Sequence, residues 1–157
     1  KNSNTPSVIA LSRQKLSFVT ETLAKKNLCG LGAYEIKKST HNPELTLISS
    51  GSEVQIALEA FNKLNDLNIS SKVVSMPCQE LFEKQSNDYK EKILEKNSLK
   101  ISIEASSVAS WEKYVGKNGY SLGIKSFGKS APIKDLYKYF NLTSDHIVKI
   151  AKKMLGK

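Results

Sequence analysis

Apolar residues change their spacing along the chain, and each spacing predicts a different kind of element. Short runs rich in apolar residues at 45–49 and 72–76 predict buried strands, and Pro77 ends the second run. Residues 99–104 alternate apolar with polar side chains, which predicts a strand with one less buried face. Between the first two strands, apolar residues recur at the three- and four-residue spacing of an amphipathic helix. These residues are Val54, Ala57, Leu58, Phe61 and Leu64.

The remaining segments continue an alternation of strands and helices. We expect a short edge strand at 33–37, a helix in two pieces over 78–95, a short helix over 107–115 and a last strand at 120–127. Strands that alternate with helices predict an α/β fold, in which an open, mostly parallel sheet is covered on both faces.

Both ends of the chain depart from this regular pattern. Pro132 suits the first turn of a helix that Asn141 stops, and Thr143 suits the N-cap of a final helix. Residues 1–32 contain an apolar step at Val8–Leu11. We expect this first segment to form a strand plus a linker without a core of its own.

The composition limits the partners. The 157 residues carry a net charge of +9, with 23 lysines and a single arginine, Arg13. The lysines are dispersed among acidic residues, which argues against a nucleic-acid partner. No apolar stretch approaches the ~20 residues needed to cross a bilayer, and no secretory signal pattern is present, so we expect a cytoplasmic protein without a membrane partner. Cys29 and Cys78 are predicted to be reduced thiols.

Residues Gly123–Ser130 match the nucleotide-binding pattern GxxxxGK[ST] letter for letter. In a working P-loop a strand ends before the first glycine, and a helix begins at the glycine-lysine pair. Here Gly123 lies inside an apolar run, and Pro132 places the helix start beyond Ser130. This context disfavours phosphate binding by Lys129. A free-standing nucleotide-binding or regulatory α/β domain nevertheless remains the alternative function.

Several other polar residues have both a structural and a functional interpretation. Ser50 and Glu53 fit a Ser-x-x-Glu capping box at a helix start, and the competing interpretation is an anion site at that helix N-terminus. Glu104 ends a predicted strand at the carboxyl edge, where open sheets bind ligands, but it has no partner visible in the sequence. His41 and His146 have no nucleophile or metal ligand at a useful spacing, so we expect both at the surface.

Six short patterns occur in order along nearly the whole chain. They are ALSRQ at 10–14, ISSGSEV at 48–54, VVSMP at 73–77, SIEAS at 102–106, the spaced Trp111, Tyr114, Gly116 and Gly119, and FGKSAP at 127–132. Each pattern is weak alone. Together they resemble the C-terminal part of transketolase.

This resemblance implies a three-layer α/β/α domain with a five-stranded, mostly parallel (mixed) sheet over residues 26–157. It also implies that residues 1–25 are the tail of a preceding pyrimidine-binding domain and a linker. In that family the catalytic residues and the ligands of the cofactor and the metal lie in the upstream domains, so none is assigned here.

The resemblance further implies an activity. Transketolases transfer a two-carbon ketol unit between sugar phosphates in the pentose phosphate pathway, using thiamine diphosphate and a divalent metal, magnesium or calcium, in a homodimer. We expect this chain to be inactive alone and to complete the folded dimer together with the upstream domains. The arginine of the family's SRQ motif binds the sugar phosphate, and it corresponds to Arg13.

Overall fold

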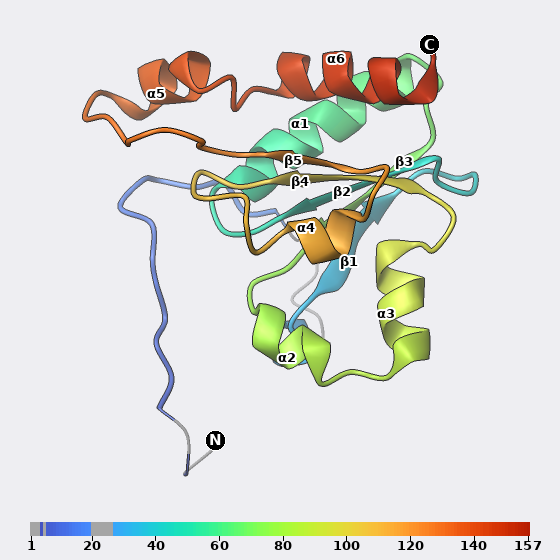
Figure 1. Ribbon diagram of the computed structural model, residues 1–157, viewed down its shortest axis with the longest axis horizontal. Helices are drawn as coiled ribbons and strands as arrows, with labels where there is room; N and C mark the ends of the chain where they lie inside the picture. Colours follow the sequence, from blue (N-terminus) through green and yellow to red (C-terminus); the bar gives the residue numbers. More distant parts are fainter. Residues whose placement is uncertain (1–3, 5, 20–26) are drawn as a thin grey trace.

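The centre of the protein is a five-stranded sheet in the order β1-β3-β2-β4-β5 (Figure 1). The computed structural model describes residue 4, residues 6–19 and residues 27–157. The strands are β1 (Tyr34–Lys38), β2 (Leu45–Ser49), β3 (Ser71–Ser75), β4 (Leu99–Ile103) and β5 (Tyr120–Leu122). β1 runs antiparallel to β3, and the other neighbouring strands are parallel. This confirms the expected mixed, mostly parallel sheet.

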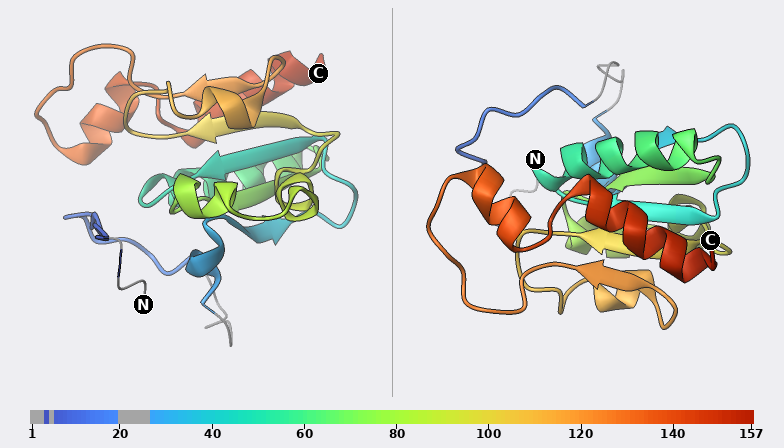
Figure 2. Two further views of the ribbon diagram at one scale, coloured as in Figure 1. Left: turned by 60° about the horizontal axis from the view of Figure 1, so that its bottom comes forward. Right: turned by 90° about the horizontal axis from the view of Figure 1, so that it is seen from above.

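Helices cover both faces of this sheet (Figures 1 and 2). One face carries α1 (Glu53–Asp66) and α6 (Ser144–Leu155), and the other carries α2 (Gln79–Glu83), α3 (Asn87–Leu94) and α4 (Glu112–Val115). A short helix, α5 (Ile133–Tyr139), precedes α6, and a 3-10 turn, η1 (Leu28–Leu31), precedes β1. The three layers confirm the α/β/α architecture.

Each face of the sheet has its own hydrophobic core, because successive strand residues point to opposite faces. Leu47 and Ile101 are fully buried on the face beneath α1 and α6. Ile48 and Val74 lie on the opposite face and pack with the aromatic side chains of Phe82, Trp111 and Tyr114. Both cores are built from residues within 33–155, so this part of the chain supplies its own interior.

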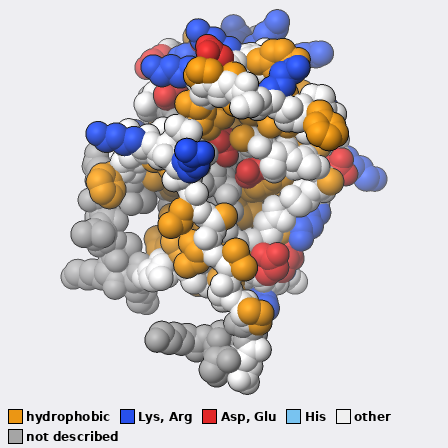
Figure 3. Space-filling model, turned by 90° about the vertical axis from the view of Figure 1, so that its left-hand side faces the viewer, with side chains coloured by type: hydrophobic (Ala, Val, Ile, Leu, Met, Phe, Trp, Pro, Cys, Tyr) orange, Lys and Arg blue, Asp and Glu red, His pale blue; other side chains and the backbone are white. Residues whose placement is uncertain are grey.

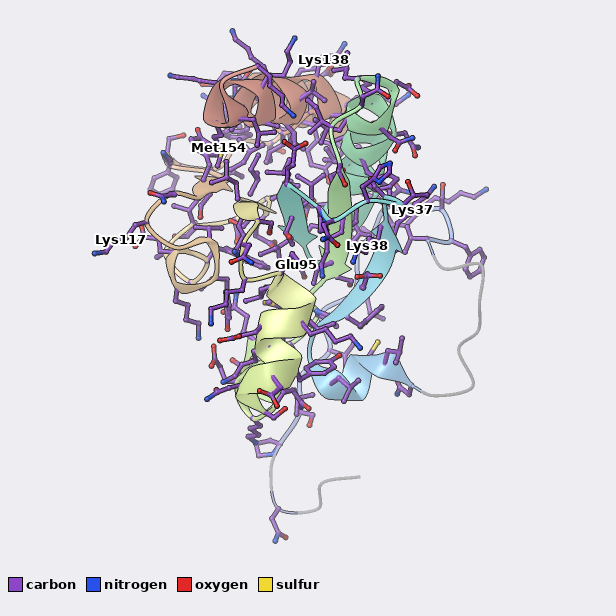
Figure 4. All side chains as sticks on the ribbon, turned by 90° about the vertical axis from the view of Figure 1, so that its right-hand side faces the viewer. Lys37, Lys38, Glu95, Lys117, Lys138 and Met154 are labelled. Carbon is purple, nitrogen blue, oxygen red and sulfur yellow. The ribbon has the colours of Figure 1, made fainter. Side chains whose placement is uncertain are left out.

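A buried lysine joins α3 to the sheet. Lys72 in β3 is 1% exposed, and its Nζ donates a hydrogen bond to the carbonyl oxygen of Lys92 at 2.8 Å. Carboxylate oxygens of Glu35 and Glu95 lie 3.4 and 3.7 Å from the same nitrogen. Figure 4 shows Glu95 where α3 ends beside the sheet. The buried charge is therefore both paired and hydrogen-bonded, as burial of a charge requires.

Several sequence predictions are confirmed residue by residue. β2 occupies the predicted residues 45–49, and the helix expected over 78–95 forms as the two pieces α2 and α3. Thr143 caps α6, because its side-chain oxygen accepts a hydrogen bond from the backbone N–H of His146.

One predicted strand is shorter than expected, and another does not form. β5 ends at Leu122, and after it the N–H of Ile124 donates to the carbonyl oxygen of Ser106 in a loop, at 2.9 Å. The chain thus leaves the sheet because its neighbour β4 has already ended. The step at Val8–Leu11 forms no strand within the described residues 6–19. Val8 and Leu11 are 94% and 84% exposed there, without a neighbouring strand to pair with.

Candidate functional site

The carboxyl ends of the parallel strands meet at one edge of the sheet, which is where open α/β sheets bind ligands. At this edge β2 leads into α1, and β4 ends just before Glu104. Figure 3 looks onto this edge and shows acidic side chains in a hollow at its centre. The fold brings together two of the residues that the sequence analysis considered separately, because the Glu53 carboxylate lies near enough to Glu104 to raise its pKa.

The expected capping box between Ser50 and Glu53 is not formed. α1 begins at Glu53, and its N-cap, Ser52, makes no side-chain capping hydrogen bond. The Glu53 carboxylate is instead buried, at 3% exposure, and accepts hydrogen bonds from Tyr137 Oη at 2.6 Å and Ser52 Oγ at 2.8 Å. This carboxylate places a negative charge at the helix start, which also disfavours the anion-site interpretation.

The sequence analysis missed the role of Tyr137. It lies 84 residues from Glu53, and only the folded chain places α5 against the start of α1. No residue of α5 is fully buried, and Tyr137 attaches the helix both by packing against the core and by this hydrogen bond. A local pattern of residues carries no signal for such a remote pair.

Burial shifts the pKa values of two side chains at this edge, Glu104 and Tyr137. Burial, and then the nearby Glu53 carboxylate, raise the pKa of Glu104 to about 7. Burial and the hydrogen bond to Glu53 raise the pKa of Tyr137 to about 12, so this hydroxyl remains a neutral donor near neutral pH. Glu104 can therefore gain or lose a proton near pH 7.

The segment Gly123–Ser130 does not have the geometry of a phosphate-binding loop. β5 does end before Gly123, as a P-loop requires, but α5 begins only at Ile133, so no helix N-terminus lies at Lys129. Figure 1 shows the segment as an extended loop between β5 and α5. The Lys129 ammonium lies 5.2 Å from the centre of the Tyr139 ring. The alternative of a P-loop nucleotide-binding domain is not supported.

The remaining candidate residues are dispersed. Arg13 is exposed in the N-terminal segment, which runs apart from the sheet in Figure 1, and its role in phosphate binding stays a prediction. His41 is exposed as expected, whereas His146 is partly buried beside α5. Cys29 and Cys78 are free thiols, as predicted.

The divalent metal that the resemblance implies needs several donor side chains close together. Among residues 4, 6–19 and 27–157, no three His, Cys, Asp or Glu side chains gather in a way that could hold a metal ion. The helices of the same described residues include none that is long and apolar enough to span a membrane.

Comparison with known proteins identifies relatives along most of the chain. Residues 32–143 match the family model described as the transketolase-like TK C-terminal domain. The transketolase of Sinorhizobium medicae is 42% identical over 153 residues, which cover 97% of this chain and 22% of that protein. Transketolase-1, chloroplastic, of Arabidopsis thaliana is 44% identical over 153 residues, which cover 94% of this chain and 20% of that protein.

A solved structure agrees with these sequence matches. The crystal structure of transketolase from Campylobacter jejuni superposes with a TM-score of 0.77 at 36% identity, covering 92% of this chain and 21% of that one. The fold and the matched residues define a C-terminal α/β domain of a larger enzyme. The chain belongs to the transketolase family and corresponds to its C-terminal part. It spans about a fifth of the length of the relatives that it matches.

Proposed function

We propose that this chain is the C-terminal portion of an enzyme that transfers a two-carbon ketol unit between sugar phosphates. The observation that carries the proposal is the 42% identity to a transketolase over 97% of the chain. In this proposal thiamine diphosphate and a divalent metal are held by other parts of the enzyme, and the chain alone is inactive. A coupled assay of the chain by itself is expected to show no ketol transfer.

The partners in this proposal are the upstream domains of the same enzyme, assembled as a homodimer. Residues 1–25 would belong to the preceding pyrimidine-binding domain and residues 26–157 to the C-terminal domain, with a boundary that lies outside the described residues. The exposed apolar side chains of Val8, Ile9 and Phe18 support this division. Burial of such side chains against another domain is favourable by about 25 cal/mol per Å² of apolar surface.

Arg13 is proposed to bind the phosphate of the sugar substrate. A guanidinium donates two parallel N–H bonds to one phosphate, and an ammonium cannot reproduce this geometry. In the full-length enzyme that carries this chain, Arg13→Lys should raise the KM for a phosphorylated acceptor by about tenfold, the loss expected for one charge-assisted hydrogen bond. Steady-state kinetics with erythrose 4-phosphate would measure this change.

The control substrate is glycolaldehyde, which has no phosphate group. Its kcat/KM should change little in Arg13→Lys, and Lys15→Ala, which removes an exposed cation two residues away, should leave both substrates unaffected. If phosphorylated and unphosphorylated acceptors lose efficiency equally, Arg13 does not bind the phosphate.

A further inference from the structure

A cavity of about 370 Å³ opens between β5 and the turn that joins α5 to α6. One wall comes from residues 120–123, 125 and 126, and the other from residues 139–141 and His146. Figure 2 shows the loop after β5, which swings out beside the sheet before it returns to α5. The volume lies within the range of about 300–1,000 Å³ that is usual for small-molecule sites.

The polar groups of this cavity favour an anion. Lys125 and His146 contribute nitrogen atoms, and Ser126 and Asn141 contribute a hydroxyl and an amide. None of the described residues that line the cavity is Asp or Glu. Lys125 also takes part in none of the ion pairs between described residues. Its ammonium can therefore pair with a ligand without first breaking an internal ion pair.

The apolar groups of the cavity favour a flat ring. Tyr120, Tyr139 and Phe140 supply three aromatic side chains to the lining. The rings of Tyr139 and Phe140 meet edge to face with centroids 4.9 Å apart, and Tyr139 is still 60% exposed. An aromatic ring that is held by its neighbour and remains accessible is a stacking surface for a planar ligand.

Asn141 shapes the cavity between the two helices. Its backbone has φ of +56°, in the left-handed region that asparagine tolerates better than most residues. This conformation ends α5 and turns the chain toward α6, so that His146 in the first turns of α6 faces the same cavity as Tyr139.

We propose that this cavity binds a small organic anion that carries a flat ring. The anionic group would contact Lys125 and His146, and the ring would stack on Tyr139. Lys125 belongs to the segment that matches GxxxxGK[ST], but the lysine of that pattern is Lys129, which does not line the cavity. The two lysines therefore distinguish this site from a P-loop.

The test is a titration of the isotope-labelled 157-residue chain with adenosine 5′-monophosphate, followed by NMR chemical shifts. Shifts are expected to concentrate on the residues that line the cavity. Lys125→Ala should weaken binding by about tenfold, as expected for one charge-assisted contact. The matched control Lys134→Ala, at an exposed lysine of α5 that does not line the cavity, should change it by less than about twofold. Adenosine, which lacks the anion, and ribose 5-phosphate, which lacks the flat base, should each bind at least about tenfold more weakly.

Each opposite outcome overturns the proposal. The absence of saturable shifts at millimolar nucleotide, or equal affinity in Lys125→Ala, removes the cavity as an anion site. Equal binding of ribose 5-phosphate removes the role of the ring. Binding that requires magnesium and disappears in Lys129→Ala would instead support a nucleotide-binding loop. Circular dichroism of each variant establishes that a lost signal does not come from unfolding.

Discussion

The sheet and the N-terminal segment both carry large apolar side chains, but these side chains are buried in the sheet and exposed in the segment. Leu47 and Ile101 in the sheet are 0% exposed, whereas Leu11 and Phe18 in the N-terminal segment are 84% and 101% exposed. The strands have helices on both faces, whereas the segment at 6–19 runs apart from the sheet in Figure 1. The difference shows that burial depends on neighbouring elements as much as on hydrophobicity.

The largest expected effect is on the free energy of unfolding, which should respond to a leucine in the sheet and not to one in the N-terminal segment. Leu47→Ala removes a fully buried side chain from β2 and should lower the free energy of unfolding by about 2–5 kcal/mol, because it leaves a cavity in the core. The matched change Leu11→Ala, at an exposed leucine, should shift it by less than about 0.5 kcal/mol in this chain. Urea denaturation measures both, and similar losses in the two variants would contradict the contrast.

An intermediate effect is expected at α5, which belongs fully to neither region. Tyr137→Phe removes the hydrogen bond to the buried Glu53 carboxylate, at a cost of about 1.5–3 kcal/mol for a bond to a charged group. Amide hydrogen exchange in α5 should become faster, while exchange in β2 stays slow.

The neighbouring exposed tyrosine provides the control for α5. Tyr139→Phe also removes one hydroxyl from the same helix, but this hydroxyl is in none of the hydrogen bonds between described residues, so exchange in α5 should not change. If both variants behave alike, the Glu53 bond does not hold α5 in place.

The smallest expected effect is a pH dependence inside the folded region. The pKa of Glu104 is about 7 in the folded chain, against an ordinary value of 4.5. Between these two values the folded chain holds more protons than the unfolded chain, so the free energy of unfolding falls as the pH rises from 4.5 to 7 and is then constant. With allowance for solvent screening we expect a loss of about 1 kcal/mol.

Glu104→Gln tests the origin of this slope. The amide keeps the shape of the protonated side chain and cannot ionise, so the variant should lose the slope and be more stable than the parent above pH 7. Urea denaturation at several pH values is the measurement. A variant that keeps the full slope would show that another group is responsible.

Local sequence patterns predicted the elements that depend on residues close together in the sequence. The apolar run at 45–49 was sufficient to define β2, and Thr143 caps a helix through a bond to a residue three positions away. The pattern failed at Val8–Leu11, because a strand needs a neighbour that the described residues do not provide.

The candidate site was less predictable than the fold. The Ser-x-x-Glu spacing predicted a cap. The buried Glu53 instead accepts a hydrogen bond from Tyr137, 84 residues away, and a pattern of neighbouring residues cannot predict so remote a partner. The raised pKa of Glu104 likewise comes from burial and from Glu53, which are properties of the folded sheet edge. The role of Arg13 rests on family resemblance and awaits the kinetic test.

The two edge strands of the sheet determine whether two copies of this chain can pair through their strands. An edge strand exposes unpaired backbone groups that can recruit a strand from another molecule. β1 opposes such pairing with Glu35, Lys37 and Lys38 and with an irregular register beside them, and Figure 4 shows both lysines on this edge. β5, at the other edge, is only three residues long. Growth of the sheet from one molecule to the next is disfavoured at both ends, so the chain is protected against aggregation through its strands.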